Sequence, residues 1–447
     1  MPSALQSRGL RRIIAAYTIN RLGTWFGYVA LSLAVFEHTH SALAVAALLV
    51  AGQALPALLV PALVARVETS PRRAKLSALY VFEALLTIAL AVLMWQFWLP
   101  AVIVLAALDG AAALAASALL RAEAARAASD QLAPAAGDVA ADERPDAQTA
   151  EREANAALNV AFSATFALGP VLGGVLVAAA GAPVALLVDA ASFLVCAAMV
   201  MHLRPQAGLA ESASVRDRLR AAWEHIDSVP ALKLLLLAEG LALVFFAADG
   251  SIEVPYAKVT LLAGDRGYGL LLTVWGLGVV AGSLAFARAV RRPLGVTLSA
   301  GTLAVGLAYI GFAAAPSLAV ACVAGFVGGL GNGVQWASLL SAVQQLTPQR
   351  LHGQLMGAVE AIGAFCPGMG LLLGGALVAI GSPRSAFLVV GVGAAAMTVA
   401  FVRLASGLRL PPRADVVEPL QPAETATSLM HEPTSVSALE LGQVDGS

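Results

Sequence analysis

Long apolar segments alternate with short polar ones along most of the chain. A helix needs about 20 mostly apolar residues to cross a bilayer core, and these segments repeatedly approach that length. Charged residues, Gly and Pro mark their ends. The pattern predicts twelve transmembrane helices, at residues 13–36, 41–65, 76–98, 100–122, 154–180, 183–203, 231–258, 268–290, 294–315, 317–345, 351–380 and 384–405.

The composition supports an all-α membrane protein. Apolar residues make up 59% of the chain, the mean hydropathy is +0.81 and charged residues are 12%, against about 25% in a soluble domain. The net charge of −1 indicates no nucleic-acid partner. We therefore expect membrane lipid to surround the protein, and a soluble enzyme is excluded.

Polar segments divide the chain into two six-helix halves. Low hydrophobicity and an excess of Ala, Pro, Glu or Ser predict disorder in the insertion and in the tail. The expected parts are a cytoplasmic N-terminus (1–12), a first bundle (13–203) with an acidic insertion (128–152), a linker (204–229), a second bundle (230–405) and a disordered tail (406–447).

Lysine and arginine in the loops predict the orientation. With a cytoplasmic N-terminus, the inward loops carry most basic residues, among them Lys75, Arg291 and Arg350, whereas the outward loops carry Arg266 and Arg384. Basic loops stay in the cytoplasm. Both termini are therefore expected in the cytoplasm.

The two halves resemble each other in sequence. The segment that begins at Gly173-Gly174 in the fifth span is similar to the one that begins at Gly374-Gly375 in the eleventh. These spans are six helices apart. The match predicts an internal duplication of the kind found in transporters, although chance similarity between Ala- and Gly-rich helices is an alternative.

The fifth span, Leu168-Gly169-Pro170-Val-Leu-Gly173-Gly174, resembles the GPxxGG core of the antiporter motif of exporters. Further similar stretches are Gln53-Ala-Leu-Pro56 and Leu330-Gly-Asn332. On these residues the chain resembles the major facilitator superfamily, in particular its bacterial macrolide-efflux and enterobactin-exporter branch. The resemblance covers about residues 10–405 and implies two pseudo-symmetric six-helix bundles.

The chain departs from the family pattern at two positions. The loop between the second and third spans carries Arg66, Arg72 and Arg73 but has Ala65 where the family has an aspartate. The first span has Thr24 where the branch often has an acid. A proton site therefore cannot be carried over from the first span.

Ionisable residues within the spans are candidates for function, because charge at bilayer depth is costly. Arg21, Glu83, Asp109, Glu239 and Glu360 fall near the middle of their spans. By resemblance, spans one, four, seven and ten line the cavity, which favours Arg21, Asp109 and Glu239. The alternative for each is a structural ion pair or hydrogen bond.

These positions give a pairing hypothesis and a coupling hypothesis. Arg21 and Glu239 lie at similar depths in the first span of each half and are predicted to pair across the cavity. Asp109 is the first candidate for proton coupling. Asp249 and Glu253 share a helix face as a candidate outer relay, and Glu360 is a further candidate.

Asn332, Gln335 and Trp336 lie on one face of the tenth span, at i, i+3 and i+4. They are candidates for the substrate cavity, with an interhelical hydrogen-bond patch as the alternative. The cluster Glu37-His38-Thr-His40 resembles a metal site only weakly. No metal and no cofactor are expected, and the dispersed cysteines predict no disulfide.

The sequence therefore predicts a secondary transporter, without enzymatic activity, that exports small amphipathic or hydrophobic compounds by alternating access. Protons are a candidate coupling ion, and a monomer is expected. The alternative is a facilitator-like protein that transports nothing and acts as a sensor or assembly partner. The absence of P-loop, HExxH and GxSxG motifs gives no support to a membrane enzyme.

Overall fold

The structure is a computed structural model in which helices form almost all the regular structure. Within the described residues there is no β-strand, so the predicted all-α class is confirmed. The described ranges are 8–56, 76–129, 147–201, 224–288, 292–348 and 352–407.

The helices of the first half follow the predicted spans closely. A Ser41 side chain accepts a hydrogen bond from the backbone N–H of Ala44 and so caps the second helix. The helices are α1 (Arg8–Thr39), α2 (Ala42–Leu49) with the π-helical turn η2 (Val50–Ala54), α4 (Leu76–Leu93), α5 (Leu99–Ser129), α6 (Ala147–Ala180) and α7 (Ala182–Val200).

The second half repeats this series of helices. Pro255 lies inside the last part of its first membrane helix, where the α-helix changes to a π-helical turn. Such a change is expected where a proline removes a helical hydrogen bond. The helices are α9 (Pro230–Ala247), α10 (Asp249–Pro255) with η5 (Tyr256–Thr260), α11 (Gly264–Arg288), α12 (Leu294–Ala314), α13 (Leu318–Gln345), α14 (His352–Ile380) and α15 (Pro383–Gly407).

One predicted boundary is wrong. The acidic insertion 128–152 was expected to be disordered throughout, but α5 continues to Ser129 and α6 begins at Ala147. Both ends of the insertion are rich in Ala, a strong helix former, so the helices extend beyond the apolar residues. The rest of the insertion, the linker up to residue 223 and the tail from residue 408 lie outside the described residues.

Eight helices among the described residues are long and apolar enough to cross a membrane. Helices also lie at the other predicted spans, and three of these have shorter apolar stretches, at Ala42–Ala54, Ala164–Ala180 and Phe365–Ile380. The multi-pass membrane protein expected from the sequence is therefore confirmed. The number of twelve crossings stays a prediction.

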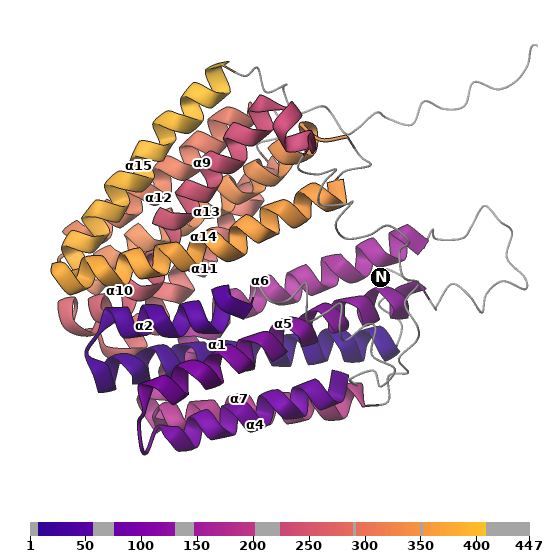
Figure 1. Cartoon of the computed structure of the whole chain (residues 1–447), viewed down its shortest axis with the longest axis vertical. Helices are drawn as coiled ribbons and strands as arrows, with labels where there is room; N and C mark the ends of the chain where they lie inside the picture. The colour runs from indigo at the N-terminus through magenta and orange to yellow at the C-terminus, as the bar shows by residue number, and fades with distance from the viewer. Residues whose placement is uncertain are drawn as a thin grey trace, which may run out of the picture.

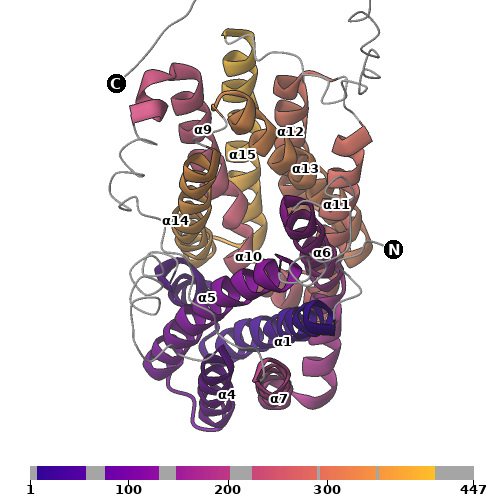
Figure 2. The same cartoon turned by 90° about the vertical axis from the view of Figure 1, so that its right-hand side faces the viewer.

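The helices form two groups that meet at one end (Figures 1 and 2). In Figure 1 the groups converge where α2, α10 and α11 lie together, and they diverge towards the N-terminus of α1. The main contacts between the groups are α6 with α11 and α2 with α14. We call the end that holds Glu37, Lys258 and Asp265 the meeting end, and the end that holds Arg12 and Arg288 the diverging end.

Aromatic side chains form the centre of the second group. Tyr256, Tyr309, Phe312 and Phe387 are each at most 1% exposed and pack ring against ring. The Tyr256 hydroxyl donates to the carbonyl oxygen of Phe312 at 2.6 Å, so its polar atom is satisfied inside the core. The second half therefore has an aromatic core of its own.

Candidate functional site

Glycine residues on α6 allow the two halves to approach closely at the meeting end. A Cβ atom on Gly174 would lie 2.7 Å from the carbonyl oxygen of Asp265 and 3.0 Å from the Cα of Gly269, both in α11. Only glycine permits that distance between the two backbones. Gly173 faces the opposite way, towards Val29 of α1 in its own half.

The other residues of the predicted motif contact the same two helices. A Cβ on Gly169 would meet the ring of Trp25 in α1 at 2.4 Å. Pro170 lies inside α6, and its carbonyl oxygen faces Gly269 of α11. The GPxxGG segment therefore packs between the first helix of its own half and α11 of the other half.

The second half contains the equivalent arrangement on α14. A Cβ on Gly374 would lie 2.1 Å from the carbonyl oxygen of Ala248, in its own half. A Cβ on Gly375 would lie 3.0 Å from Leu43 and 3.0 Å from Ala46, in α2 of the other half. In each pair the first glycine faces its own half and the second faces the partner half, so the repeat in the sequence corresponds to a repeat in the packing.

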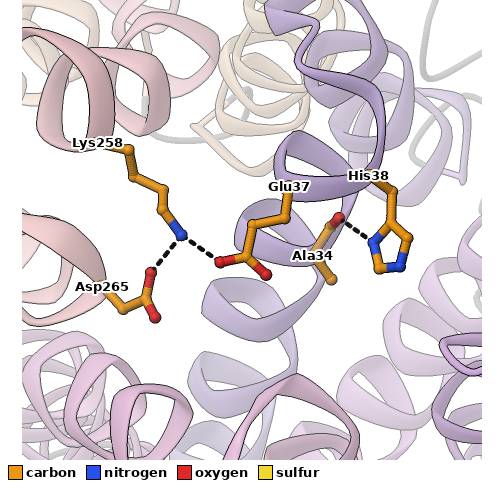
Figure 3. A network of polar contacts seen from close by, with 5 residues as sticks. All are labelled: Ala34, Glu37, His38, Lys258 and Asp265. Carbon is orange, nitrogen blue, oxygen red and sulfur yellow. Dashed lines mark hydrogen bonds and ion pairs between the residues drawn. The ribbon is translucent and has the colours of Figure 1, made fainter.

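A polar network joins the halves at the meeting end (Figure 3). Lys258 of η5 bonds to Glu37, at the end of α1, and to Asp265 of α11, the latter at 2.6 Å. The Lys258 and Asp265 side chains are 20% and 19% exposed, and Glu37 is 48% exposed. Lys258 therefore has one partner in each half. Sequence reasoning missed this network, since Glu37 and Lys258 are 221 residues apart.

His38, beside Glu37, contacts its own helix and Phe97. The Nδ1 atom of His38 lies 2.8 Å from the carbonyl oxygen of Ala34, as Figure 3 shows, and its ring stacks on Phe97 with centroids 4.3 Å apart. No group of three possible metal ligands occurs among the described residues.

Asp249 and Glu253, the predicted outer relay, lie in α10 near the meeting end. Glu253 is 3% exposed. Tyr28 of α1 and Tyr268 of α11 lie close enough to interact electrostatically with Glu253, and Tyr28 also faces Asp249. The two carboxyl groups thus lie among residues of both halves.

The first half contains a cluster of three carboxyl groups. Asp109 of α5 and Asp189 of α7 both interact electrostatically with Glu83 of α4. Glu83 is fully buried, and neither of its oxygens has a hydrogen-bond partner. Asp189 packs against α1, where a Cβ on Gly27 would meet its carboxylate at 2.3 Å. The structure therefore brings the predicted cavity acid Asp109 together with Glu83 and Asp189.

Glu239 of α9 has a different partner from the one predicted. Its Oε2 atom accepts a hydrogen bond from Nε2 of Gln335 in α13 at 2.6 Å. The predicted pair of Glu239 with Arg21 is not among the ion pairs of the described residues. The halves are joined mainly through α6–α11 and α2–α14, and not through α1 and α9, which carry these residues.

The candidate residues on α13 differ in exposure. Gln335 is 1% exposed and turns towards Glu239, whereas Trp336 is 36% exposed. A Cβ on Gly363 of α14 would lie 3.8 Å from the Trp336 ring, and Asn332 is partly buried. Gln335 thus forms the interhelical hydrogen bond that was the alternative to substrate contact, and Trp336 remains accessible.

Several predicted residues cannot be placed. Arg66, Arg72 and Arg73 lie outside the described residues, as does Ala65. Glu360 lies in α14, but its side chain is outside the described part of the chain.

Comparisons with known proteins agree with this architecture. Residues 241–439 match the model of the Major Facilitator Superfamily. The multidrug efflux pump Tap of Mycobacterium tuberculosis, like that of Mycobacterium bovis, is 27% identical over 286 residues, which cover 60% of this chain. The chain spans 66% of the length of these relatives.

Solved transporter structures share the fold. The nucleoside transporter NupG has a TM-score of 0.68 at 12% identity, with 89% of this chain and 99% of that chain covered. A POT family transporter in complex with a thioalcohol-conjugated peptide has a TM-score of 0.65 at 10% identity, with 90% of this chain and 96% of that chain covered. An inward-facing, unoccupied bacterial homologue of the human lysosomal transporter Spinster has 0.61 at 14% identity, with 91% and 96% covered.

The fold, with its paired contacts between two repeated halves, is the one found in solved transporter structures. The match over residues 241–439 and the efflux-pump relatives agree with the resemblance seen in the sequence: the chain is similar to transporters of the Major Facilitator Superfamily.

Proposed function

We propose that the protein exports small amphipathic or hydrophobic compounds across a bacterial inner membrane by alternating access, as a monomer with both termini in the cytoplasm. The observation that carries the proposal is the contact of the two repeated halves at one end, through Gly174 and Gly375, together with their divergence at the other end. The relatives named as multidrug efflux pumps support export as the direction.

The diverging end is the one that the basic loops assign to the cytoplasm. The structure then represents the state that loads cargo from the cytoplasm. Release needs the α6–α11 and α2–α14 contacts to separate while the diverging end closes. The Lys258–Glu37 pair has to break in the same step, because its members belong to different halves.

We propose protons as the coupling ion and Asp109 as the group that carries them. The Thr24 hydroxyl bonds to Asn20 at 2.9 and 3.1 Å, so the position where the branch often has an acid holds a locally satisfied hydroxyl. Asp109 is partly exposed, although its Oδ1 atom is buried without a hydrogen-bond partner, whereas its neighbour Glu83 is fully buried and neither of its oxygens has a partner. Asp109 is therefore better placed than Glu83 to exchange a proton with water.

The few polar groups among the predicted cavity residues of α13 support this substrate class. Trp336 offers an accessible aromatic face, and Asn332 adds one partly buried amide. Such a surface suits a molecule that is mostly apolar with a few polar atoms.

The test is accumulation of a panel of amphipathic compounds in a host that lacks its own exporters. Cells that express the protein should accumulate less of at least one compound, and Asp109→Asn should restore accumulation. An Asp227→Asn variant, changed at an exposed carboxyl outside the meeting end, is the matched control and should still export. Binding of panel compounds without any change in accumulation would instead support the transport-inactive sensor.

A further inference from the structure

Glu239 is a buried carboxyl group that has no basic partner among the described side chains. It is 1% exposed, its Oε2 atom accepts from the neutral amide of Gln335 at 2.6 Å, and its Oε1 atom is buried without a partner. A buried carboxylate that stays ionised usually has a cation or several donors around it. Glu239 has one neutral donor in this structure.

The titratable groups around Glu239 are few. Cys366 of α14 interacts electrostatically with it. The described basic residues of α15 are Arg384, which bonds to carbonyl oxygens at the end of α12, and Arg403 at the far end of the helix. Lys233 of α9, the helix that carries Glu239, pairs with Asp227 just before that helix. Asp249 lies in α10, near the meeting end. The side chain of Glu360 is outside the described part of α14.

Glutamine suits both protonation states of a neighbouring carboxyl. Its NH₂ group donates to an ionised oxygen, and its carbonyl oxygen accepts from a protonated one. The two groups exchange places when the amide rotates by half a turn, without any movement of the helix. A Lys or Arg partner would instead favour only the ionised form.

We propose that Glu239 is a second proton-binding group, in the C-terminal half, and that Gln335 is the positioning residue that holds it in either protonation state. The carboxylate takes one proton from water and becomes a neutral acid, and it returns that proton to water when it ionises again. This inference deepens the proposed function, because with Asp109 each half then carries one proton site.

The site lies beside residues that link it to the candidate cavity. Trp336 follows Gln335 on α13 and is accessible, and Cys366 is partly exposed. A Cβ on Gly240, next to Glu239 in the chain, would lie 3.3 Å from the Cys366 sulfur.

The test uses dicyclohexylcarbodiimide, which reacts with protonated carboxyl groups in apolar surroundings, on the full-length protein in nanodiscs. Labelling of Glu239 is followed by peptide mass mapping over a pH series. It should fall as the pH rises. In Gln335→Met the labelling should persist to a pH higher by about one unit or more, because the ionised form loses its donor.

Ser338→Ala is the matched control, since Ser338 lies one turn further along α13 and donates to Thr297 at 2.8 Å. It should leave the titration of Glu239 unchanged. Labelling that is absent or independent of pH, or a Gln335→Met profile equal to that of the unchanged protein, would overturn the proposal even if export is proton-driven. A titrating Glu239 in a protein that exports nothing would refute the proposed function and leave the proton site standing.

Discussion

Replacing Gly174 by alanine should weaken the contact between the two halves. The added Cβ would lie 2.7 Å from the Asp265 carbonyl oxygen and 3.0 Å from the Cα of Gly269. Both are backbone atoms, so no side chain can rotate away and α6 has to move from α11. Overpacking of this kind costs about 1–3 kcal/mol.

The clash acts only in the state in which the meeting end is closed. The gain in helix propensity from Gly to Ala, about 1 kcal/mol, is the same in every state in which α6 is helical, so it cancels in the conformational equilibrium. The clash alone should lower the population of this state about 5- to 150-fold relative to the opened one, at about 1.4 kcal/mol for each factor of ten.

Electron–electron double resonance can measure this shift. Spin labels at Trp98 and Leu262, which are 63% and 83% exposed, report the distance between the halves at the meeting end. Gly174→Ala should increase the long-distance population. Gly363→Ala is the control, because its Cβ would meet none of the described atoms closer than 3.8 Å. A Gly174→Ala distribution equal to that of the control would refute the reasoning.

Three further predictions concern single side chains. Glu37→Gln should raise the population with an open meeting end by less than about fivefold, because so exposed a pair with Lys258 contributes at most about 1 kcal/mol. In the same distance measurement, 1 M salt should abolish the difference between the variant and the unchanged protein. Asp109→Asn should abolish the pH-driven accumulation of substrate in proteoliposomes but retain substrate binding. Accumulation equal to that of the unchanged protein would show that another group binds the proton. Arg384→Lys should lower the thermal unfolding temperature, because Lys cannot match the fork that bonds to Ala313 and Ala315, and an unchanged temperature would show that those bonds contribute little.

The helices could be predicted from local information, since each apolar stretch has to satisfy its backbone hydrogen bonds within itself. The span predicted at 294–315 is α12 (Leu294–Ala314), for example. The largest error lies at α5 and α6, where Ala-rich polar sequence continues the helices beyond the apolar stretches. Membrane hydropathy identifies the crossing part of a helix and does not locate its end in water.

The repeat of Gly173-Gly174 and Gly374-Gly375 in the sequence indicated the glycine contacts. The sequence did not indicate which polar side chains bond to each other. The Lys258–Glu37 pair and the Glu239–Gln335 bond join helices far apart in the chain. Equal depth in two spans, the basis for pairing Glu239 with Arg21, does not determine which faces of the helices turn towards each other.

The most direct test of the account measures both ends of the protein under the same conditions. One pair of spin labels at Trp98 and Leu262 reports the meeting end, and a second pair at Arg12 and Arg288 reports the diverging end. Alternating access predicts that an exported compound or a change of pH alters the two populations in opposite directions, so that the meeting end opens as the diverging end closes. Distances that stay fixed at both ends, or that increase together, would contradict the account.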